Sequence, residues 1–213
     1  MSESPVPSFD MGHRLMLGVL VSGRGSNLQA IMEAVEDGRL SARVAVVMSN
    51  KKEAPALELA RKRGIPTLFL NPSDYPDRSG YDEVMIQTLK MYGVEVVVLA
   101  GYMRLVTPML VQTYPNRIIN IHPSLLPAFP GLQAQSQAIA YGAKVSGCTV
   151  HFVDEEVDHG PIIAQTAVPV LEGDSEASLT DRILAEEHRL LPRVLQLYAE
   201  GRVNVDGRKV LIL

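Results

Sequence analysis

Two polar residues of complementary chemistry, Asn120 and His122, stand two positions apart at the end of a short apolar run, 117–121. Alternate side chains of a strand point to the same face, so the amide and the imidazole are expected to face one target. An amide donor beside an imidazole can hold a carbonyl whose oxygen becomes negative during nucleophilic attack. The alternative is a strand-end pair that only hydrogen-bonds to nearby loops, and an Asn-x-His taken alone favours that alternative.

A candidate acid, Asp158, lies in an acidic loop, 154–160, that follows another apolar run. A carboxylate facing His122 would favour the charged form of the imidazole near neutral pH. A run of acidic residues usually forms a solvated turn, and this alternative stays open. Sequence spacing does not show that the carboxylate and the ring meet.

A glycine-containing loop, 22–27 (Ser-Gly-Arg-Gly-Ser-Asn), joins a predicted strand to a predicted helix. Unpaired N–H groups and the positive end of the helix dipole would hold a phosphate there. A dinucleotide fingerprint needs a third glycine where this chain has Leu28, and an acid where the second strand ends in Ser49-Asn50. The Gly-Lys-Ser/Thr of a triphosphate loop does not occur either. The loop therefore favours a monophosphate, against the simpler alternative of a turn capped by Ser or Asn.

Other reactive side chains are weaker candidates. Cys148, the single cysteine, lies in a predicted buried strand without a basic neighbour and is expected to be a structural thiol. The remaining histidines lack metal-ligand spacing with one another or with Cys148, so no metal site is predicted. A Gly-x-Ser-x-Gly elbow does not occur, which disfavours a serine hydrolase.

Composition and charge disfavour several classes of function. The 213 residues carry 20 Lys and Arg against 24 Asp and Glu, and this net charge of −4 gives no bulk attraction to nucleic acid. Apolar runs such as 94–100 are far shorter than the roughly 20 residues that span a bilayer. Residues 1–13 are polar and lack the apolar core of a signal peptide. We therefore expect a flexible N-terminal tail, 1–13, on a cytoplasmic protein that binds small molecules and neither nucleic acid nor membrane.

The elements that must position these residues alternate in the first half of the chain. Short apolar runs predict strands at 15–21, 44–48, 67–70 and 94–99, and helical patterns separate them, from about 27, over 54–63 and over 81–92. Continuous apolar strands separated by helices predict a doubly wound α/β fold, with a mostly parallel sheet and helices on both faces. The most apolar run, 94–99, is expected at the centre of this sheet.

Beyond residue 108 the pattern changes. The predicted elements are a strand at 117–121, a helix at about 133–141, strands near 148–153 and 162–170, and a long helix at about 178–200 with a kink at Pro192. Asp206-Gly207 between apolar positions predicts a C-terminal hairpin. We expect a single domain, 14–213, with two halves at about 14–115 and 116–213 and a cleft between them.

Taken together, these segments resemble the phosphoribosylglycinamide formyltransferase family over about 15–201. The matching segments are 22–27, 96–104 (Val-Val-Val-Leu-Ala-Gly-Tyr-Met-Arg), 120–127 (Asn-Ile-His-Pro-Ser-Leu-Leu-Pro), 147–152, 158–161 (Asp-His-Gly-Pro) and 187–188 (Glu-His). The resemblance implies direct transfer of a formyl group from the co-substrate 10-formyltetrahydrofolate to the amine of glycinamide ribonucleotide in purine synthesis. It implies no acyl-enzyme and no metal, a nucleotide-binding first half, and a folate-binding and catalytic second half.

By matching position, the resemblance also implies roles for individual residues. Asn120 and protonated His122 would stabilise the oxyanion, and Asp158 would keep His122 charged and organise a water that relays a proton. The residues implied to bind glycinamide ribonucleotide are Gly25, Ser26, Asn27 and Glu187. Those implied to bind the folate are Arg78, Met103, Arg104, Leu105, Val106 and Asn120, with Asp154, Glu155, Glu156, Val157 and Asp158 closing over the pterin.

Departures and alternatives accompany this resemblance. Gln133 and Gln135 stand where family members often carry histidine, and an amide can hydrogen-bond but cannot carry a proton. One alternative is formyltetrahydrofolate hydrolase, which has a similar core with an added N-terminal regulatory domain, where this sequence has only a short tail. Methionyl-tRNA formyltransferase carries an added C-terminal RNA-contacting domain and more positive charge. A non-catalytic nucleotide-binding module would use the glycine loop alone. The chain is expected to be a monomer or a homodimer.

Overall fold

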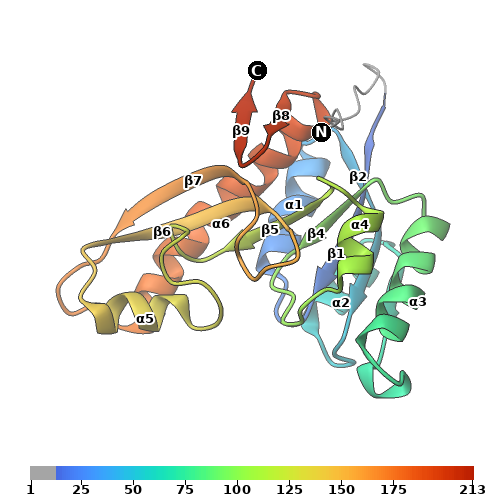
Figure 1. Cartoon of the computed structure of the whole chain (residues 1–213), viewed down its shortest axis with the longest axis horizontal. Coiled ribbons are helices and arrows are strands. Elements are labelled where there is room, and N and C mark those ends of the chain that lie inside the picture. The colour runs from blue at the N-terminus through green and yellow to red at the C-terminus, as the bar shows by residue number, and fades with distance from the viewer. Residues whose placement is uncertain (1–12) are drawn as a thin grey trace.

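The structure, a computed structural model, describes residues 13–213 (Figure 1). Its strands are β1 Leu15–Val21, β2 Ala42–Ser49, β3 Thr67–Phe69, β4 Val96–Leu99, β5 Ile118–His122, β6 Val145–Phe152, β7 Ile162–Pro169, β8 Val203–Asp206 and β9 Lys209–Ile212. Its helices are α1 Ser26–Glu36, α2 Pro55–Lys62, α3 Arg78–Met91, α4 Pro108–Thr113, α5 Ala134–Tyr141 and α6 Glu176–Ala199, with a short 3-10 helix, η1 Pro72–Asp74. Apart from His13, the predicted N-terminal tail lies outside the described residues.

Within residues 13–213, seven strands form one sheet in the order β3-β2-β1-β4-β5-β6-β7, and β8 and β9 form a separate hairpin. The five strands from β3 to β5 are parallel, whereas β6 and β7 extend the sheet in antiparallel fashion. This confirms the predicted mostly parallel α/β fold, with the long helix and the hairpin at the C-terminal end. Strand β4 is the central strand, as its uninterrupted apolar run predicts, and all four of its residues are buried.

Two apolar cores cover the two faces of the sheet, because both faces of the parallel strands are buried. Leu17 and Val19 of β1 pack toward α1, α2 and α6, whereas Leu20 of the same strand packs toward α3 and α4. Figure 1 shows α6 running along the sheet behind β6 and β5, with α3 on the opposite side of the molecule. Helix α6 continues through Pro192, where a kink is predicted, and it packs against α1.

Two short elements are missing from the prediction, and several boundaries differ from it by one to three residues, among them the start of β6. The six residues of α4 and the three of η1 complete too few turns to produce an apolar period, and neither is predicted. Strand β6 begins at Val145 rather than near 148, because Ser146 and Gly147 interrupt the apolar run at its start.

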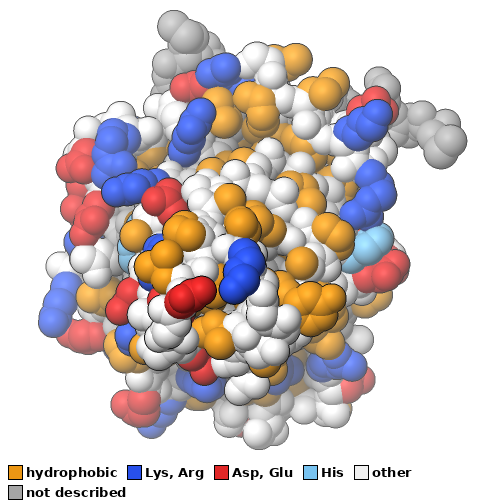
Figure 2. Space-filling view, turned by 90° about the vertical axis from the view of Figure 1, so that its left-hand side faces the viewer, with side chains coloured by type: hydrophobic (Ala, Val, Ile, Leu, Met, Phe, Trp, Pro, Cys, Tyr) orange, Lys and Arg blue, Asp and Glu red, His pale blue; other side chains and the backbone are white. Residues whose placement is uncertain are grey.

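The surface is polar and mixed in charge. Figure 2 shows basic and acidic side chains interspersed with apolar ones over the face that it presents. Among residues 13–213, none of the helices combines the length and the apolar character needed to cross a bilayer.

Candidate active site

A large cleft opens where the strand order reverses between β1 and β4, the place where open α/β sheets bind ligands. The loops that follow these two strands are joined there. Ser22 donates its N–H to the Gly101 carbonyl at 3.1 Å, and its hydroxyl accepts from the Met103 N–H at 2.8 Å. The cavity volume of about 1060 Å³ lies at the upper end of the range for small-molecule sites.

Every residue that the sequence marks as a site candidate lines this one cleft. They are Gly25, Ser26, Asn27, Arg78, Met103, Arg104, Leu105, Val106, Asn120, His122, Asp154, Glu155, Glu156, Val157, Asp158 and Glu187. Residues from both predicted halves of the chain therefore meet across it. The cleft also includes residues without a predicted role, among them Arg24, Gly131 and His151.

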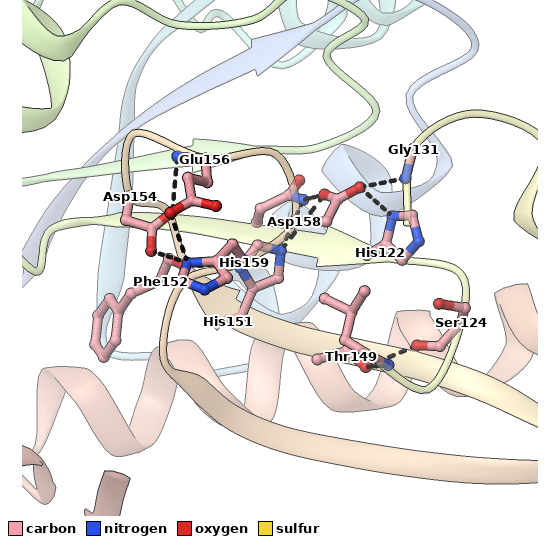
Figure 3. A network of polar contacts seen from close by, with 12 residues as sticks. His122, Ser124, Gly131, Thr149, His151, Phe152, Asp154, Glu156, Asp158 and His159 are labelled. Carbon is pink, nitrogen blue, oxygen red and sulfur yellow. Dashed lines mark hydrogen bonds and ion pairs between the residues drawn. The ribbon is translucent and has the colours of Figure 1, made fainter. Parts of the chain in front are cut away.

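The carboxylate of Asp158 lies at the centre of the candidate catalytic group (Figure 3). Its Oδ2 is 3.3 Å from His122 Nδ1 and accepts from the Gly131 N–H at 2.7 Å. Its Oδ1 accepts from Asn120 Nδ2 at 3.4 Å. The side chain is only 12% exposed, so Asp158 does not belong to a solvated turn. The structure thus brings the acid and the imidazole together, which the spacing leaves open.

Both ring nitrogens of His122 face oxygen acceptors. Nδ1 faces Asp158, and Nε2 lies 2.9 Å from the Phe129 carbonyl oxygen. A neutral imidazole donates from one nitrogen only, whereas an imidazolium donates from both. The surroundings of this buried ring therefore suit its doubly protonated form.

A second buried histidine, His151, supports Asn120 and is missed by the sequence reasoning. The two residues are directly opposite each other on β5 and β6. His151 Nδ1 lies 2.7 Å from the Phe152 carbonyl oxygen, which only accepts, so Nδ1 carries the hydrogen. Nε2 then accepts from Asn120 Nδ2 at 3.1 Å. The signal in the sequence is a lone histidine inside an apolar strand, which more often marks a satisfied core residue than a functional one.

Burial lowers the pKa of His151, while its hydrogen bond to Phe152 and the Asp158 charge oppose the shift. The Nε2 atom is 3.8 Å from Asp158 Oδ1, within ion-pair distance. We nevertheless regard the ring as neutral, because a lowered pKa and the lone pair presented to Asn120 agree with each other. His151 therefore fixes the direction of the Asn120 amide rather than pairing with Asp158.

The glycine loop leaves backbone donors at the start of α1. Gly25 occupies the N-cap position with φ +83°, and among the described residues no side chain caps the helix. The alternative of a turn capped by Ser or Asn is therefore wrong. A Cβ added at Gly25 would lie 2.6 Å from the Ala56 Cβ, so the close approach of α2 also requires glycine.

A buried carboxylate from α6 completes this end of the cleft. Asn27 Nδ2 donates to Glu187 Oε2 at 2.7 Å, across 160 residues of sequence. Burial raises the pKa of Glu187, and the hydrogen bond from Asn27 opposes the shift. Within the described part of the chain, the buried Asn27 Oδ1 has no hydrogen-bond partner. A ligand that donates a hydrogen bond would suit both residues.

The opposite end of the cleft has apolar walls and basic groups. Met103, Leu105 and Val157 are more than half exposed or close to it, and all three line the cleft. The 103–106 segment is fixed at its C-terminal end, because the buried Asp82 carboxylate accepts from the Thr107 N–H at 2.7 Å. The Arg104 guanidinium lies 4.8 Å from the centre of the Tyr81 ring. This arrangement suits a flat aromatic ligand with an acidic tail.

Three further predictions concern Gln133, Gln135 and Cys148. Both glutamines line the cleft, and Gln133 forms the N-cap of α5 with φ +59°. Cys148 is fully buried, and burial raises the pKa of its thiol to about 12, as expected for a structural cysteine. Within residues 13–213, no group of three or more His, Cys, Asp or Glu side chains is arranged to hold a metal ion.

An open α/β sheet whose cleft brings an amide, an imidazole and a loop carboxylate together, beside an uncapped glycine loop, fits the class of the formyl transferases. Residues 16–195 match the family described as Formyl transferase. The chain is 46% identical to the phosphoribosylglycinamide formyltransferase of Escherichia coli (strain K12) over 187 residues, which are 88% of each protein. The chain belongs to the phosphoribosylglycinamide formyltransferase family.

Two further comparisons agree with this assignment. The crystal structure of glycinamide ribonucleotide transformylase 1 from Symbiobacterium toebii shares 54% of its sequence with this chain, with a TM-score of 0.94 and 99% coverage of both chains. The trifunctional purine biosynthetic protein adenosine-3 of Drosophila pseudoobscura pseudoobscura is 48% identical over 193 residues. That match spans 90% of this chain but only 14% of the longer relative.

Proposed function

We propose that this chain transfers the formyl group of 10-formyltetrahydrofolate to the amine of glycinamide ribonucleotide, giving formylglycinamide ribonucleotide and tetrahydrofolate. The observation that carries the proposal is the contact of Asp158 with both His122 and Asn120, inside a cleft that also contains the glycine loop. Family membership supports the reaction, and the geometry supports the roles of the residues.

The nucleotide is proposed to bind at the α1 end of the cleft. Gly25, Ser26 and Asn27 offer donors at the positive end of the α1 dipole, which favours a phosphate. Glu187 lies 2.7 Å from Asn27 and suits a ribose hydroxyl, which could donate to the carboxylate. The amine of the substrate then extends toward Asn120 and His122.

The folate is proposed to bind at the other end. Its pterin would lie between the 103–106 segment and the 154–158 loop, both of which line the cleft. Arg78 and Arg104 line the cleft and would attract the negative glutamate tail. Binding in this direction places the formyl group beside the β5 end, next to Asn120.

The amine attacks the formyl carbon, and the carbonyl oxygen becomes an oxyanion. Two N–H groups make long contacts with Asp158, one from His122 Nδ1 at 3.3 Å and the other from Asn120 Nδ2 at 3.4 Å, whose second hydrogen is donated to His151. We assign these hydrogens to the oxyanion, since catalytic hydrogen bonds often tighten only when the ligand is bound. Asp158, 3.3 Å from Nδ1, is proposed to orient the His122 ring toward this oxygen.

The remaining step moves one proton. The attacking nitrogen gains a positive charge, and N10 of the folate must accept a proton as its bond to the formyl carbon breaks. A water held by Asp158 is proposed to relay the proton from the amine to N10, so no covalent enzyme intermediate forms. Gln133 and Gln135 line this region but cannot carry a proton, so they contribute hydrogen bonds alone.

One experiment tests the proposal. The folate absorbance of purified protein with 10-formyltetrahydrofolate is followed with and without glycinamide ribonucleotide. Turnover that requires the nucleotide supports formyl transfer. Release of formate without the nucleotide would show a hydrolase instead, formylation of methionyl-tRNA would show the tRNA enzyme, and nucleotide binding without turnover would show a binding module.

We also propose that the protein is cytoplasmic, in keeping with purine synthesis, and that it is a monomer or a homodimer, two states that analytical ultracentrifugation distinguishes.

A further inference from the structure

A contact outside the proposed catalytic group links the C-terminal hairpin to the loop that carries Asp158. Arg208, in the turn between β8 and β9, donates from Nη2 to the His159 carbonyl oxygen at 2.7 Å. Its Nη1 lies 3.1 Å from His159 Nε2 and 3.3 Å from Nδ1. A side chain from the C-terminal hairpin therefore holds the residue that directly follows Asp158.

The contact continues into the loop through His159. The His159 Nδ1 atom lies 2.8 Å from Asp154 Oδ2 and 3.9 Å from Glu156 Oε1. Because a carboxylate only accepts, Nδ1 carries the hydrogen that Asp154 accepts. Nη1 of Arg208 is almost equally far from the two ring nitrogens, so the guanidinium lies over the face of the His159 ring. Asp154 Oδ1 in turn accepts from the Glu156 N–H at 3.0 Å. Arg208, His159 and Asp154 are thus linked by two hydrogen bonds, to the His159 carbonyl oxygen and from its Nδ1 to Asp154, with the guanidinium packed on the ring between them, and this link spans the loop from its end to its start.

The loop needs such restraint because its backbone is not relaxed. Asp158 has φ +50°, a left-handed conformation that is unfavourable for a residue with a Cβ. At Gly160, an added Cβ would lie 2.0 Å from the Phe152 carbonyl oxygen, so the end of the loop passes close to the backbone at the end of β6. Asp158 is held on its inner side by Gly131 and His122, and Arg208 supplies the outer restraint.

The hairpin is itself fixed to the protein and can therefore act as an anchor. Val203 at the start of β8 is 1% exposed and belongs to the larger apolar core, and β9 lies beside β7. The Leu213 N–H donates to the Arg202 carbonyl at 2.9 Å, which closes the hairpin at its far end. Figure 1 shows this hairpin, in red, beside β7 at one edge of the molecule.

We propose that Arg208 is a positioning residue which, through His159, holds the 154–160 loop in the conformation that presents Asp158 to His122 and covers the folate. The inference rests on the proposed function for its effect on turnover. The restraint on the loop is a property of the fold, and it can be measured without turnover. The His159 side chain is 45% exposed, so the expected effect is moderate, about a two- to fivefold rise in the folate KM when the contact is removed.

The test compares Arg208→Ala with Lys209→Ala, which removes the same charge from the next, exposed position of the hairpin. Arg208→Ala is expected to raise the KM for 10-formyltetrahydrofolate and to leave the KM for glycinamide ribonucleotide unchanged. It should also speed amide hydrogen exchange in residues 154–160 but not in the core strands. Arg208→Lys should restore part of the folate KM and of the slow loop exchange, because lysine keeps the charge and one donor nitrogen but lacks the planar, forked guanidinium.

The inference is overturned if Arg208→Ala and Lys209→Ala agree in folate KM and in the exchange rates of residues 154–160. His159→Ala, which removes the side-chain path alone, must loosen the same segment, and unchanged exchange there would also contradict the inference. Hydrogen exchange needs no turnover. Faster loop exchange in Arg208→Ala, together with an inactive parent protein, would refute the proposed function and leave the restraint standing.

Discussion

Replacing Asp158 with asparagine tests the centre of the proposed site with almost no change in size. The Gly131 N–H donates to Oδ2 at 2.7 Å, so the amide oxygen of the new side chain should keep that position. The amide NH₂ then takes the position of Oδ1 and faces the Asn120 NH₂, which lies 3.4 Å away. The substitution therefore removes the negative charge beside His122 and sets two donors against each other.

The expected loss of kcat in Asp158→Asn follows from these contacts. A hydrogen bond to a charged group contributes about 1.5–3 kcal/mol, which corresponds to a loss of about 10- to 150-fold if it acts only in the transition state. Loss of the water-mediated proton relay would bring the decrease in kcat to about 10²–10⁴-fold. The affinity for the nucleotide should change little, because the residues proposed to bind it are the glycine loop and Glu187, at the α1 end of the cleft.

The assay measures kcat from the folate absorbance and the Kd for glycinamide ribonucleotide by calorimetry. Asp181→Asn, an equal change of charge at an exposed position on α6, is the control. A kcat for Asp158→Asn equal to that of the control would remove Asp158 from the mechanism. A large loss of affinity for glycinamide ribonucleotide would instead show that Asp158 also contributes to nucleotide binding.

The remaining predictions concern the neighbours of this group. His151→Ala should lower kcat about tenfold with little effect on the KM for the nucleotide, because Asn120 loses its nearest acceptor, and His151→Gln should restore part of the rate; equal rates for the two variants would contradict this. Since burial raises the pKa of Glu187, the folded state binds the proton more tightly, and stability falls as pH rises from the unfolded value through the folded one. Glu187→Gln should therefore raise the Tm at pH 7–8, by about 2–4 °C for each kcal/mol gained in the free energy of unfolding, and should leave the Tm unchanged below about pH 4. A difference in Tm between the variant and the parent protein that does not depend on pH would show that the buried charge is not the cause. Gly25→Ala should cost about 1–3 kcal/mol of unfolding free energy, because of its φ of +83° and its contact with α2, whereas Gly23→Ala, with open space around it, should change stability by less than about 0.5 kcal/mol in urea denaturation.

Much of the fold could be predicted because its signals are local. The bounds of β1 are those of the apolar run 15–21, and the start of α1 falls one residue before the predicted one. A strand that is buried on both faces produces a continuous apolar run, and a helix produces a period of 3.6 residues, so each is visible within a short window. The short α4 and η1 escaped prediction because they are too brief to show a period.

Part of the site could be predicted because it lies at the ends of these elements. Asn120 and His122 close β5, and the glycine loop lies between β1 and α1. Strand ends and helix starts are the places where backbone groups and side chains reach a ligand, so residue type and position together indicate chemistry. The sequence indicates Asp158 of the 154–160 loop as a candidate and His122 as its possible partner, but the spacing does not show that the two groups meet.

The sequence by itself therefore determined the elements, the residues that end them and the kind of chemistry they suit. Only the tertiary structure decided which of these residues meet. The register of β5 against β6 places His151 opposite Asn120, and the left-handed turn at Asp158 directs its carboxylate to His122. The packing of α6 on α1 joins Glu187 to Asn27. These pairings depend on strand register and helix packing over long separations, which no local pattern encodes.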